Sequence, residues 1–350
     1  MMQRLIKTAK TAAVLLLSGL LLAGCGESSA KTEEAMERIR DLDYEGALTL
    51  LEEAREEGEN ERLILRGTGI AYMGQTRYQE AIEAFRGSLA LSDGFVQSID
   101  YDLNYYLAAA CTKAGEYEDA ESVYNAVLAM EEQEDALFLR GMVRLRLDRF
   151  SEAKEDFDRV VALDPANVDR IIEIYQALEN GGYRQAGLEY LEALLGRKDG
   201  KLTSLERGRI YFYMGQYREA AAELEDARTA GDSFDASLFL GRSYEAVGEY
   251  NYASNVYESY LAKDDTAAIL HNQLGMCRLK MGNYSGALEC FQAGKALGDQ
   301  SVMQSLAFNE IVAYEYLGEF SRANELMQSY LKNYPDDADA LRERDFLSTR

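Results

Sequence analysis

The sequence contains no tryptophan and a single histidine, His271, among its 350 residues. Ser–His–Asp triads, Cys–His pairs and histidine-rich metal centres all need an imidazole ring beside the reacting or ligating atom. The sequence therefore predicts no catalytic residue, no metal site and no cofactor. His271 itself falls where a predicted helix needs an apolar side chain, so we expect it to lie at the edge of the core.

Basic residues are also scarce relative to acidic ones. The chain has 37 lysines and arginines against 61 aspartates and glutamates, which gives a formal net charge of −24. Binding to nucleic acid and to anionic lipid headgroups depends on basic patches. The composition therefore predicts that the protein binds no nucleic acid and does not dock on anionic lipid through its own charge.

The abundant feature of the sequence is a pattern that recurs about every 34 residues. An alanine is preceded three residues earlier by tyrosine or phenylalanine and followed four residues later by a large apolar residue. A fixed period with small and large apolar residues at constant offsets indicates a stacked array of repeats. The nine alanines are Ala47, Ala81, Ala120, Ala153, Ala186, Ala220, Ala253, Ala287 and Ala323.

This pattern resembles the tetratricopeptide repeat, in which each unit is a pair of antiparallel helices. Within each unit the first helix carries a small residue followed three later by an aromatic one, as in Gly208 and Tyr211. The turn carries a glycine two residues before the next aromatic residue, as in Gly215. The resemblance implies an all-α superhelix of about nine helical hairpins over residues 31–335, closed by a capping helix in residues 336–350.

Three positions depart from the regular pattern. In the second repeat, either Gly67 or Gly69 fits the small position, and the register stays open by two residues. The fifth repeat has Ile174 where a small residue is expected. A spacing of 39 residues predicts about five additional residues near Ser92–Ile99, between the second and third repeats.

Residues 1–24 contain no acidic residue and precede the repeats. Three basic residues, Arg4, Lys7 and Lys10, precede an apolar run over residues 12–23. Because this run is too short to span a membrane, the segment predicts an export signal. The sequence Leu-Ala-Gly-Cys that ends at Cys25 resembles the bacterial lipoprotein box, which implies that Cys25 is lipidated and becomes the mature amino terminus. The alternative is an ordinary signal peptide with a coincidental cysteine.

Removal of residues 1–24 would change the formal net charge from −24 to −27. Residues 25–30 would then connect the lipid to the first helix, and two lipid chains suffice for stable attachment. The sequence thus predicts an extracytoplasmic protein anchored to the bacterial cell membrane. Gly26 and the short connection favour a host with a single membrane, and an outer-membrane location stays open.

Three cysteines, Cys111, Cys277 and Cys290, follow the predicted lipidation site. Cys277 and Cys290 lie at equal distances from a predicted turn, so a disulfide between them is conceivable in an exported protein. Axes of packed helices are about 8–10 Å apart, whereas a disulfide needs closer Cα atoms. We therefore favour buried free thiols.

The resemblance also implies a concave groove lined by one stripe of the first helices. The stripe carries apolar and aromatic residues followed by two arginines, as expected of a site for a protein or peptide partner. Alternatively, neighbouring helices cover part of the stripe, and Arg209 and Arg242 pair with Glu206 and Glu245. The predicted partner-binding residues are Tyr105, Phe138, Met142, Leu145, Tyr175, Arg209, Phe212 and Arg242.

The function predicted from these features is that of a membrane-anchored scaffold that binds an unidentified protein or peptide, without enzymatic activity. One alternative is a non-catalytic subunit of a cell-envelope assembly or polymer-export complex. A second alternative, a hydrolase of envelope material, requires paired carboxylates in the groove, where the sequence places mostly apolar residues.

Overall fold

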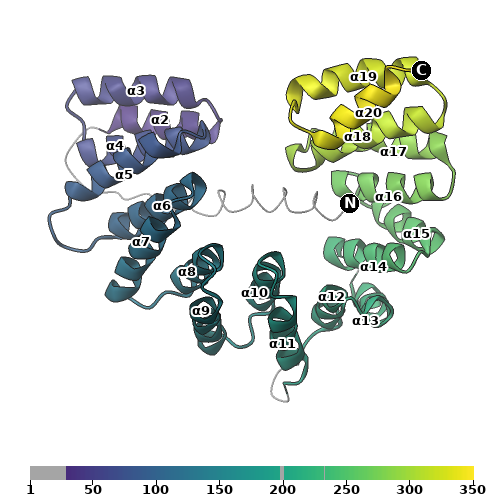
Figure 1. Cartoon of the computed structure of the whole chain (residues 1–350), viewed down its shortest axis with the longest axis horizontal. Helices are drawn as coiled ribbons and strands as arrows, with labels where there is room; N and C mark the ends of the chain where they lie inside the picture. The colour runs from purple at the N-terminus through teal and green to yellow at the C-terminus, as the bar shows by residue number, and fades with distance from the viewer. Residues whose placement is uncertain (1–28, 198–200, 232) are drawn as a thin grey trace. The chain divides into compact units, whose positions relative to one another are not determined.

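The computed structural model describes residues 29–197, 201–231 and 233–350, and all regular secondary structure in these ranges is α-helical. The described residues fall into two compact units (Figure 1), one ending at Gly196 and the other running from Arg197 to Arg350. The predicted export signal in residues 1–24 and the lipidation site Cys25 lie outside the described residues.

In the unit ending at Gly196, consecutive helices pack in antiparallel pairs that follow one another in chain order. The first and second helices of the pairs are α2 (Ala30–Arg40) with α3 (Tyr44–Glu56), α4 (Glu61–Gly74) with α5 (Tyr78–Ala90), α6 (Ser98–Ala114) with α7 (Tyr117–Met130), α8 (Glu134–Arg146) with α9 (Phe150–Leu163), and α10 (Val168–Asn180) with α11 (Arg184–Leu195).

The unit from Arg197 to Arg350 repeats this arrangement and ends with a single helix that packs on the last pair. Its helices are α12 (Ser204–Met214) with α13 (Tyr217–Ala230), α14 (Phe234–Ala246) with α15 (Tyr250–Leu261), α16 (Ala268–Lys280) with α17 (Tyr284–Ala296), α18 (Gln300–Tyr316) with α19 (Phe320–Asn333), and the terminal α20 (Ala338–Leu347). The all-α solenoid predicted from the sequence is confirmed.

The turn inside each pair is set by a residue in the left-handed backbone region. Gly215 closes α12 with φ 81°, and Tyr217, two residues later, opens the second helix. Glycine adopts this conformation without steric cost because it has no Cβ. Three turns of the unit ending at Gly196 use other residues, namely Leu42 (φ 64°), Thr76 (φ 61°) and Asp148 (φ 58°).

The small residue of the first helix packs directly against the large residue of the second. A Cβ added at Gly241 would overlap the ring of Tyr257, and one at Gly69 would overlap the ring of Phe85. Gly67 instead faces Leu51 of the preceding repeat, where an added Cβ would lie 3.0 Å from a leucine methyl carbon. Gly69 is therefore the small residue of the second repeat, which settles the register that the sequence left open.

The fifth repeat corrects the predicted register by one residue. Gly182, and not Gly181, has the positive φ of 88°, and the second helix begins at Arg184. Gly187 is buried against the ring and backbone of Tyr175, whereas Ala186 is only half-buried. In this repeat the large Tyr175 thus takes the place of the small residue on the first helix, and Gly187 takes the place of the alanine on the second helix, four residues before the buried Leu191.

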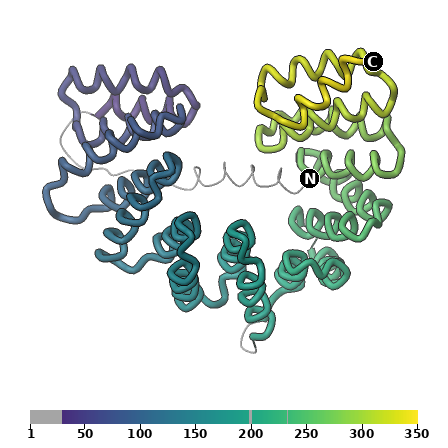
Figure 2. The backbone as a smooth tube through the Cα atoms, viewed as in Figure 1, coloured from purple at the N-terminus to yellow at the C-terminus, as the bar shows by residue number. Residues whose placement is uncertain are grey.

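The predicted insertion between the second and third repeats is a loop followed by a long first helix. Residues 91–97 connect α5 to α6, and the backbone leaves the stacked helices there (Figure 2). Helix α6 has 17 residues and begins with a capping box in which Asp100 accepts a hydrogen bond from the amide of Gln97 at 2.8 Å. At the loop tip, Phe95 is 76% exposed.

Both prolines follow the ends of second helices: α9 ends two residues before Pro165 and α19 ends two residues before Pro335. Helix α20 follows and buries Ala340 and Leu347 against α19. Ala338 and Phe346 of this helix are exposed.

Cys111, Cys277 and Cys290 are buried free thiols, as favoured from the sequence. Burial raises the pKa of Cys111 and Cys290 to about 11. The pKa of Cys277 is also raised, by burial first and then by the carboxylate of Glu245. These thiols therefore stay protonated at neutral pH.

The one histidine, His271, is half-buried. Its ring Nε2 lies 3.0 Å from the carbonyl oxygen of Asp265. This position agrees with the predicted place at the edge of the core.

Candidate functional site

The first helices present one face whose positions are defined relative to the small residue of each repeat: three residues before it, one after it and four after it. We call this the first-helix face. In the unit ending at Gly196 it includes Tyr105, Met142 and Leu145. Met142 is 41% exposed, and Tyr105 and Leu145 are half-buried. These three residues present apolar surface at the positions predicted from the sequence.

Tyr105 is fixed in place by a polar contact with the next repeat. Its hydroxyl donates a hydrogen bond to Oε1 of Gln133 at 2.8 Å, and its ring lies edge-on to Tyr124 with centroids 6.2 Å apart. Burial and the nearby carboxylate of Asp135 raise the pKa of Tyr105 to about 12. The side chain is therefore a neutral, oriented ring that offers one edge to a partner.

Phe138 and Tyr175, both among the predicted partner-binding residues, are buried, in agreement with the alternative that neighbouring helices cover part of the stripe. Phe138 is 8% exposed and lies beneath the guanidinium of Arg170, 4.6 Å from ring centroid to Cζ. Tyr175 is 2% exposed, and its hydroxyl donates to Glu179 at 2.6 Å. Tyr175 was assigned to the face through the register that is wrong by one residue; the corrected positions are Ile172, Gln176 and Glu179.

In the unit from Arg197 to Arg350, four residues of α12 and α14 form what we call the Arg–Phe patch: Arg209, Phe212, Phe239 and Arg242. The guanidinium of Arg242 lies over the ring of Phe212 at 4.9 Å, and that of Arg209 lies over Phe239 at 5.6 Å. The two rings meet edge to face with centroids 5.2 Å apart. Each arginine thus packs on the ring of the neighbouring repeat, a contact worth about 0.5–1 kcal/mol at an exposed site.

The carboxylates proposed as partners of these arginines have other contacts. Glu206 completes the capping box of α12 and accepts from the backbone amide of Thr203 at 2.6 Å. Glu245 accepts from the hydroxyl of Tyr257 and from Nε2 of Gln273 at 3.2 Å. Burial raises the pKa of Glu245, and the charge of Arg242 opposes that rise. The cross-stacking on phenylalanine was not foreseen, because the sequence does not show which ring of the next repeat an arginine covers.

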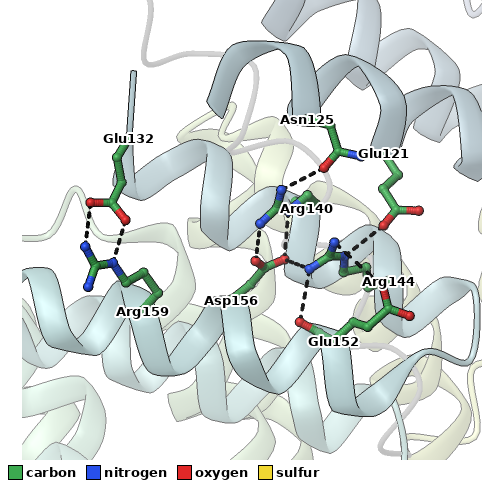
Figure 3. A network of polar contacts seen from close by, with 8 residues as sticks. All are labelled: Glu121, Asn125, Glu132, Arg140, Arg144, Glu152, Asp156 and Arg159. Atoms are coloured by element: carbon green, nitrogen blue, oxygen red, sulfur yellow. Dashed lines mark hydrogen bonds and ion pairs between the residues drawn. The ribbon is translucent and has the colours of Figure 1, made fainter. Parts of the chain in front are cut away.

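A buried ion network joins three helices, and sequence reasoning missed it. Asp156 of α9 accepts from Arg140 at 3.0 Å and from Arg144 at 2.9 Å, both on α8 (Figure 3). Arg144 also donates to Glu121 of α7 at 2.8 Å. Asp156 and Glu121 are 3% and 7% exposed. Since each buried carboxylate is matched by arginine, the network fixes the third repeat against the fourth and leaves no open ligand position.

One group of side chains has the spacing of metal ligands. The ligand atoms of Cys111, Glu116 and Asp119 lie within 4.8 Å of one another. The raised pKa of the buried thiol disfavours the thiolate, and Asp119 pairs with Arg86 at 2.6 Å. This arrangement therefore disfavours a cation. Within the described ranges, none of the helices has the length and apolarity needed to cross a membrane.

Comparison with known families places the chain in the tetratricopeptide repeat family. Four models of the tetratricopeptide repeat match it, over residues 72–142, 134–167, 32–94 with 205–268, and 308–337. Together these segments cover more than half of the chain, which therefore belongs to this family. Members of the family are generally non-catalytic scaffolds that bind proteins.

Two curated relatives match part of the chain. The chain is 27% identical over 265 residues to RNA polymerase II-associated protein 3 of Homo sapiens, covering 62% of this chain and 38% of that protein. It is 25% identical over 213 residues to the Protein CTR9 homolog of Arabidopsis thaliana, covering 57% of this chain and 19% of that protein. The matches thus span well under half the length of either relative.

Among solved structures, the chain is similar to a tetratricopeptide repeat protein from Parabacteroides merdae ATCC 43184, with a TM-score of 0.46 and 19% identity over 80% of this chain and 97% of that one. A second similar structure is YrrB, described as a TPR protein with an unusual peptide-binding site. Its TM-score is 0.38, with 20% identity over 54% of this chain and 97% of that one.

Proposed function

We propose that this protein is a scaffold that binds a protein or peptide partner on the first-helix face, and that the Arg–Phe patch is its principal contact. The observation that carries the proposal is the pair of arginines stacked on rings, Arg242 on Phe212 and Arg209 on Phe239. Arginine and aromatic residues dominate the binding energy of protein interfaces.

The stacking also prepares the patch for binding. A guanidinium that stacks on a ring has a fixed orientation. The N–H groups along its planar edge can then donate hydrogen bonds to a carboxylate or to backbone carbonyls of a partner. The protein is strongly acidic, so two adjacent arginines on one half-buried surface stand out against its overall charge. We infer that they orient the bound segment, while apolar contact supplies the buried area.

In the unit ending at Gly196, Tyr105, Met142 and Leu145 serve as a separate apolar contact surface. Tyr105 is held by Gln133, and Met142 is a flexible side chain that adapts to an irregular partner surface. This set replaces Phe138 and Tyr175, whose burial leaves them to the core.

The experiment begins with cross-linking in cells and identification of the captured partner by mass spectrometry. Purified partner is then titrated against the double variant Arg209→Glu with Arg242→Glu at low and high salt. We expect binding to weaken most at low salt, because two attractive charges become repulsive. The matched control, Arg218→Glu with Lys332→Glu, changes charge equally at exposed positions of second helices.

A second variant, Tyr105→Ala with Met142→Ala, tests the apolar surface. Its effect should fall on the dissociation rate and depend little on salt, because no charge changes. Circular dichroism verifies that each variant is folded. Binding equal to that of the unaltered protein in both folded double variants would place the binding surface elsewhere and refute the proposal.

We further propose that the protein is exported and attached to the bacterial cell membrane through lipidated Cys25. The proposal rests on the basic start, the short apolar run and the Leu-Ala-Gly-Cys sequence. Cys25→Ala should abolish lipid labelling and leave the protein unprocessed or released from membranes. If the Cys25→Ala protein remains in the membrane fraction and has the same mature amino terminus as the wild type, the proposed lipid anchor is wrong.

A further inference from the structure

We propose that a cleft between α15, α16 and α17 accepts a lysine or arginine side chain from a basic segment of a protein partner. The cleft has a volume of about 310 Å³ and is lined by residues of two consecutive repeats. It contains no residue of the Arg–Phe patch and lies entirely within the unit from Arg197 to Arg350. The inference is therefore independent of the proposed first-helix site.

The floor of the cleft is apolar and made of short side chains. Leu274 and Cys290 are buried at its base, with Leu261, Ala262 and Ala293 around them. The thiol of Cys290 is neutral, since burial raises its pKa to about 11. A floor of this kind accommodates the methylene stem of a long basic side chain, which gains by leaving water while its charged end stays at the rim.

One wall of the cleft is formed by Arg278, whose positive charge is paired with Glu258. Arg278 donates to Glu258 at 3.0 Å, to the backbone carbonyl of Gly286 at 3.0 Å and to Sγ of Cys290 at 3.2 Å. Because the guanidinium is held by three acceptors on α15 and α17, it neither swings into the cleft nor leaves Glu258 with an unmatched charge.

The remaining charge of the lining is negative. Glu289, an exposed residue of α17, has no hydrogen-bond or ion-pair partner within the part of the chain that the structure describes. His271, which also lines the cleft, has its ring Nε2 3.0 Å from the carbonyl oxygen of Asp265. The charges of Arg278 and Glu258 cancel, so Glu289 gives the lining a net negative charge. A negative rim above an apolar floor is complementary to a basic side chain.

The test uses hexalysine as the probe and methyl NMR of leucine-labelled protein as the measurement. Hexalysine should shift the methyl resonances of Leu261 and Leu274, and hexanorleucine should not. Glu289→Gln should weaken binding about twofold to fivefold at low salt, the effect of one exposed ion pair. The control Glu219→Gln removes the same charge from an exposed position of α13 and should leave these shifts unchanged.

Ala293→Leu separates shape from charge, because the larger side chain occupies part of the cleft without altering any charged group. Ala293 is exposed, so the variant is expected to fold. Binding measured at the leucine methyls should be lost in this variant at both low and high salt. Equal weakening by Glu289→Gln and Glu219→Gln, or unchanged binding by folded Ala293→Leu, would show that hexalysine associates only with the general negative charge and would overturn the proposal.

Discussion

The two units join their successive repeats with different mixtures of ion pairs and neutral hydrogen bonds. In the unit ending at Gly196 an arginine repeatedly meets a carboxylate of the adjacent repeat. The pairs are Arg62–Asp100, Arg66–Asp102, Arg86–Asp119, Arg144–Glu121, Arg159–Glu132 and Arg170–Glu134. In the unit from Arg197 to Arg350, the ion pairs Arg278–Glu258 and Lys295–Glu310 also join adjacent repeats. Neutral donors cross the contacts between repeats beside them: Tyr244 to Glu225, Gln273 to Glu245, Gln292 to Glu310, and Asn309 to Asn272.

This difference matters because ionic and neutral joints respond to different conditions. Exposed ion pairs weaken with salt, buried pairs fail when one partner is removed, and neutral hydrogen bonds are nearly indifferent to ionic strength. In an array whose repeats contact only their neighbours, each joint is a local determinant of stability. The exposed pairs Arg86–Asp119 and Arg159–Glu132 therefore make the contacts between repeats that they span, in the unit ending at Gly196, sensitive to ionic strength.

The largest expected effect comes from Asp156→Ala in the buried network. Removal of this carboxylate leaves Arg140 and Arg144 without their shared acceptor, and breaking a buried pair costs about 3–5 kcal/mol. Urea unfolding should show the loss, and hydrogen exchange should place it in α7, α8 and α9. Glu155→Ala, which removes an exposed carboxylate from the same helix, should cost less than about 1 kcal/mol. Equal costs for the two variants would contradict the structural importance of the network.

An effect of intermediate size is expected in the fifth repeat. Gly187→Leu places a side chain against the backbone of Tyr175, and overpacking of this kind costs roughly 1–3 kcal/mol. Ala186→Leu, one residue earlier, changes a half-buried position and should be tolerated. Thermal unfolding of both variants checks the corrected register. If Ala186→Leu is the more damaging substitution, the register predicted from the sequence is right after all.

The stability of the last repeat in the unit from Arg197 to Arg350 is expected to depend on pH. Burial, together with the neighbouring carboxyl of Glu343, raises the pKa of Glu315 to about 8. A carboxyl whose pKa is raised on folding binds its proton more tightly in the folded state, so its contribution to stability is complete below the unfolded pKa and is lost as pH rises towards 8.

Glu315→Gln, which keeps a neutral side chain, should therefore raise the melting temperature at pH 9 and have little effect at pH 4. Glu325→Gln, at an exposed position paired with Arg322, serves as the control. Melting curves of Glu315→Gln that parallel those of the wild type across this range would exclude a strained carboxyl at this position.

The smallest effect is that of salt on the joints themselves. An increase in ionic strength should speed local opening in the unit ending at Gly196 more than in the other unit, because exposed pairs such as Arg86–Asp119 are screened. Each pair contributes at most about 1 kcal/mol, so the change in hydrogen exchange is modest. Arg86→Gln should reduce the salt response of the contact between the second and third repeats, where Arg62–Asp100 and Arg66–Asp102 remain, and should leave the contacts between other repeats unchanged.

Much of the fold followed from the sequence because its strongest signals are local. The aromatic residue that opens each second helix, such as Tyr217, and the buried Ala220 three residues later lie where the periodicity placed them. The fifth repeat was misplaced because Gly181 and Gly182 both permit the turn, and only packing against Tyr175 decides between them.

The candidate site was harder to predict, because exposure depends on neighbouring repeats. Phe138 has the right position on its helix, yet Arg170 from the next repeat covers it. Asp156 is adjacent to a regular core position and has no distinguishing spacing, so its part in a buried network emerges only when α8 and α9 are packed together. Periodicity assigns a residue to a face, and the neighbouring helix decides whether that face meets solvent.

The turns at Leu42, Thr76 and Asp148 have a consequence for how the sequence of this protein can evolve. A left-handed conformation costs a residue with a side chain about 1–2 kcal/mol, which glycine avoids. Replacement of Leu42 or Thr76 by glycine would thus strengthen one hairpin without altering the Arg–Phe patch or the cleft beside Glu289. Such replacements would raise the stability of the first half of the chain. They would therefore compensate for substitutions elsewhere that strengthen binding but destabilise the fold.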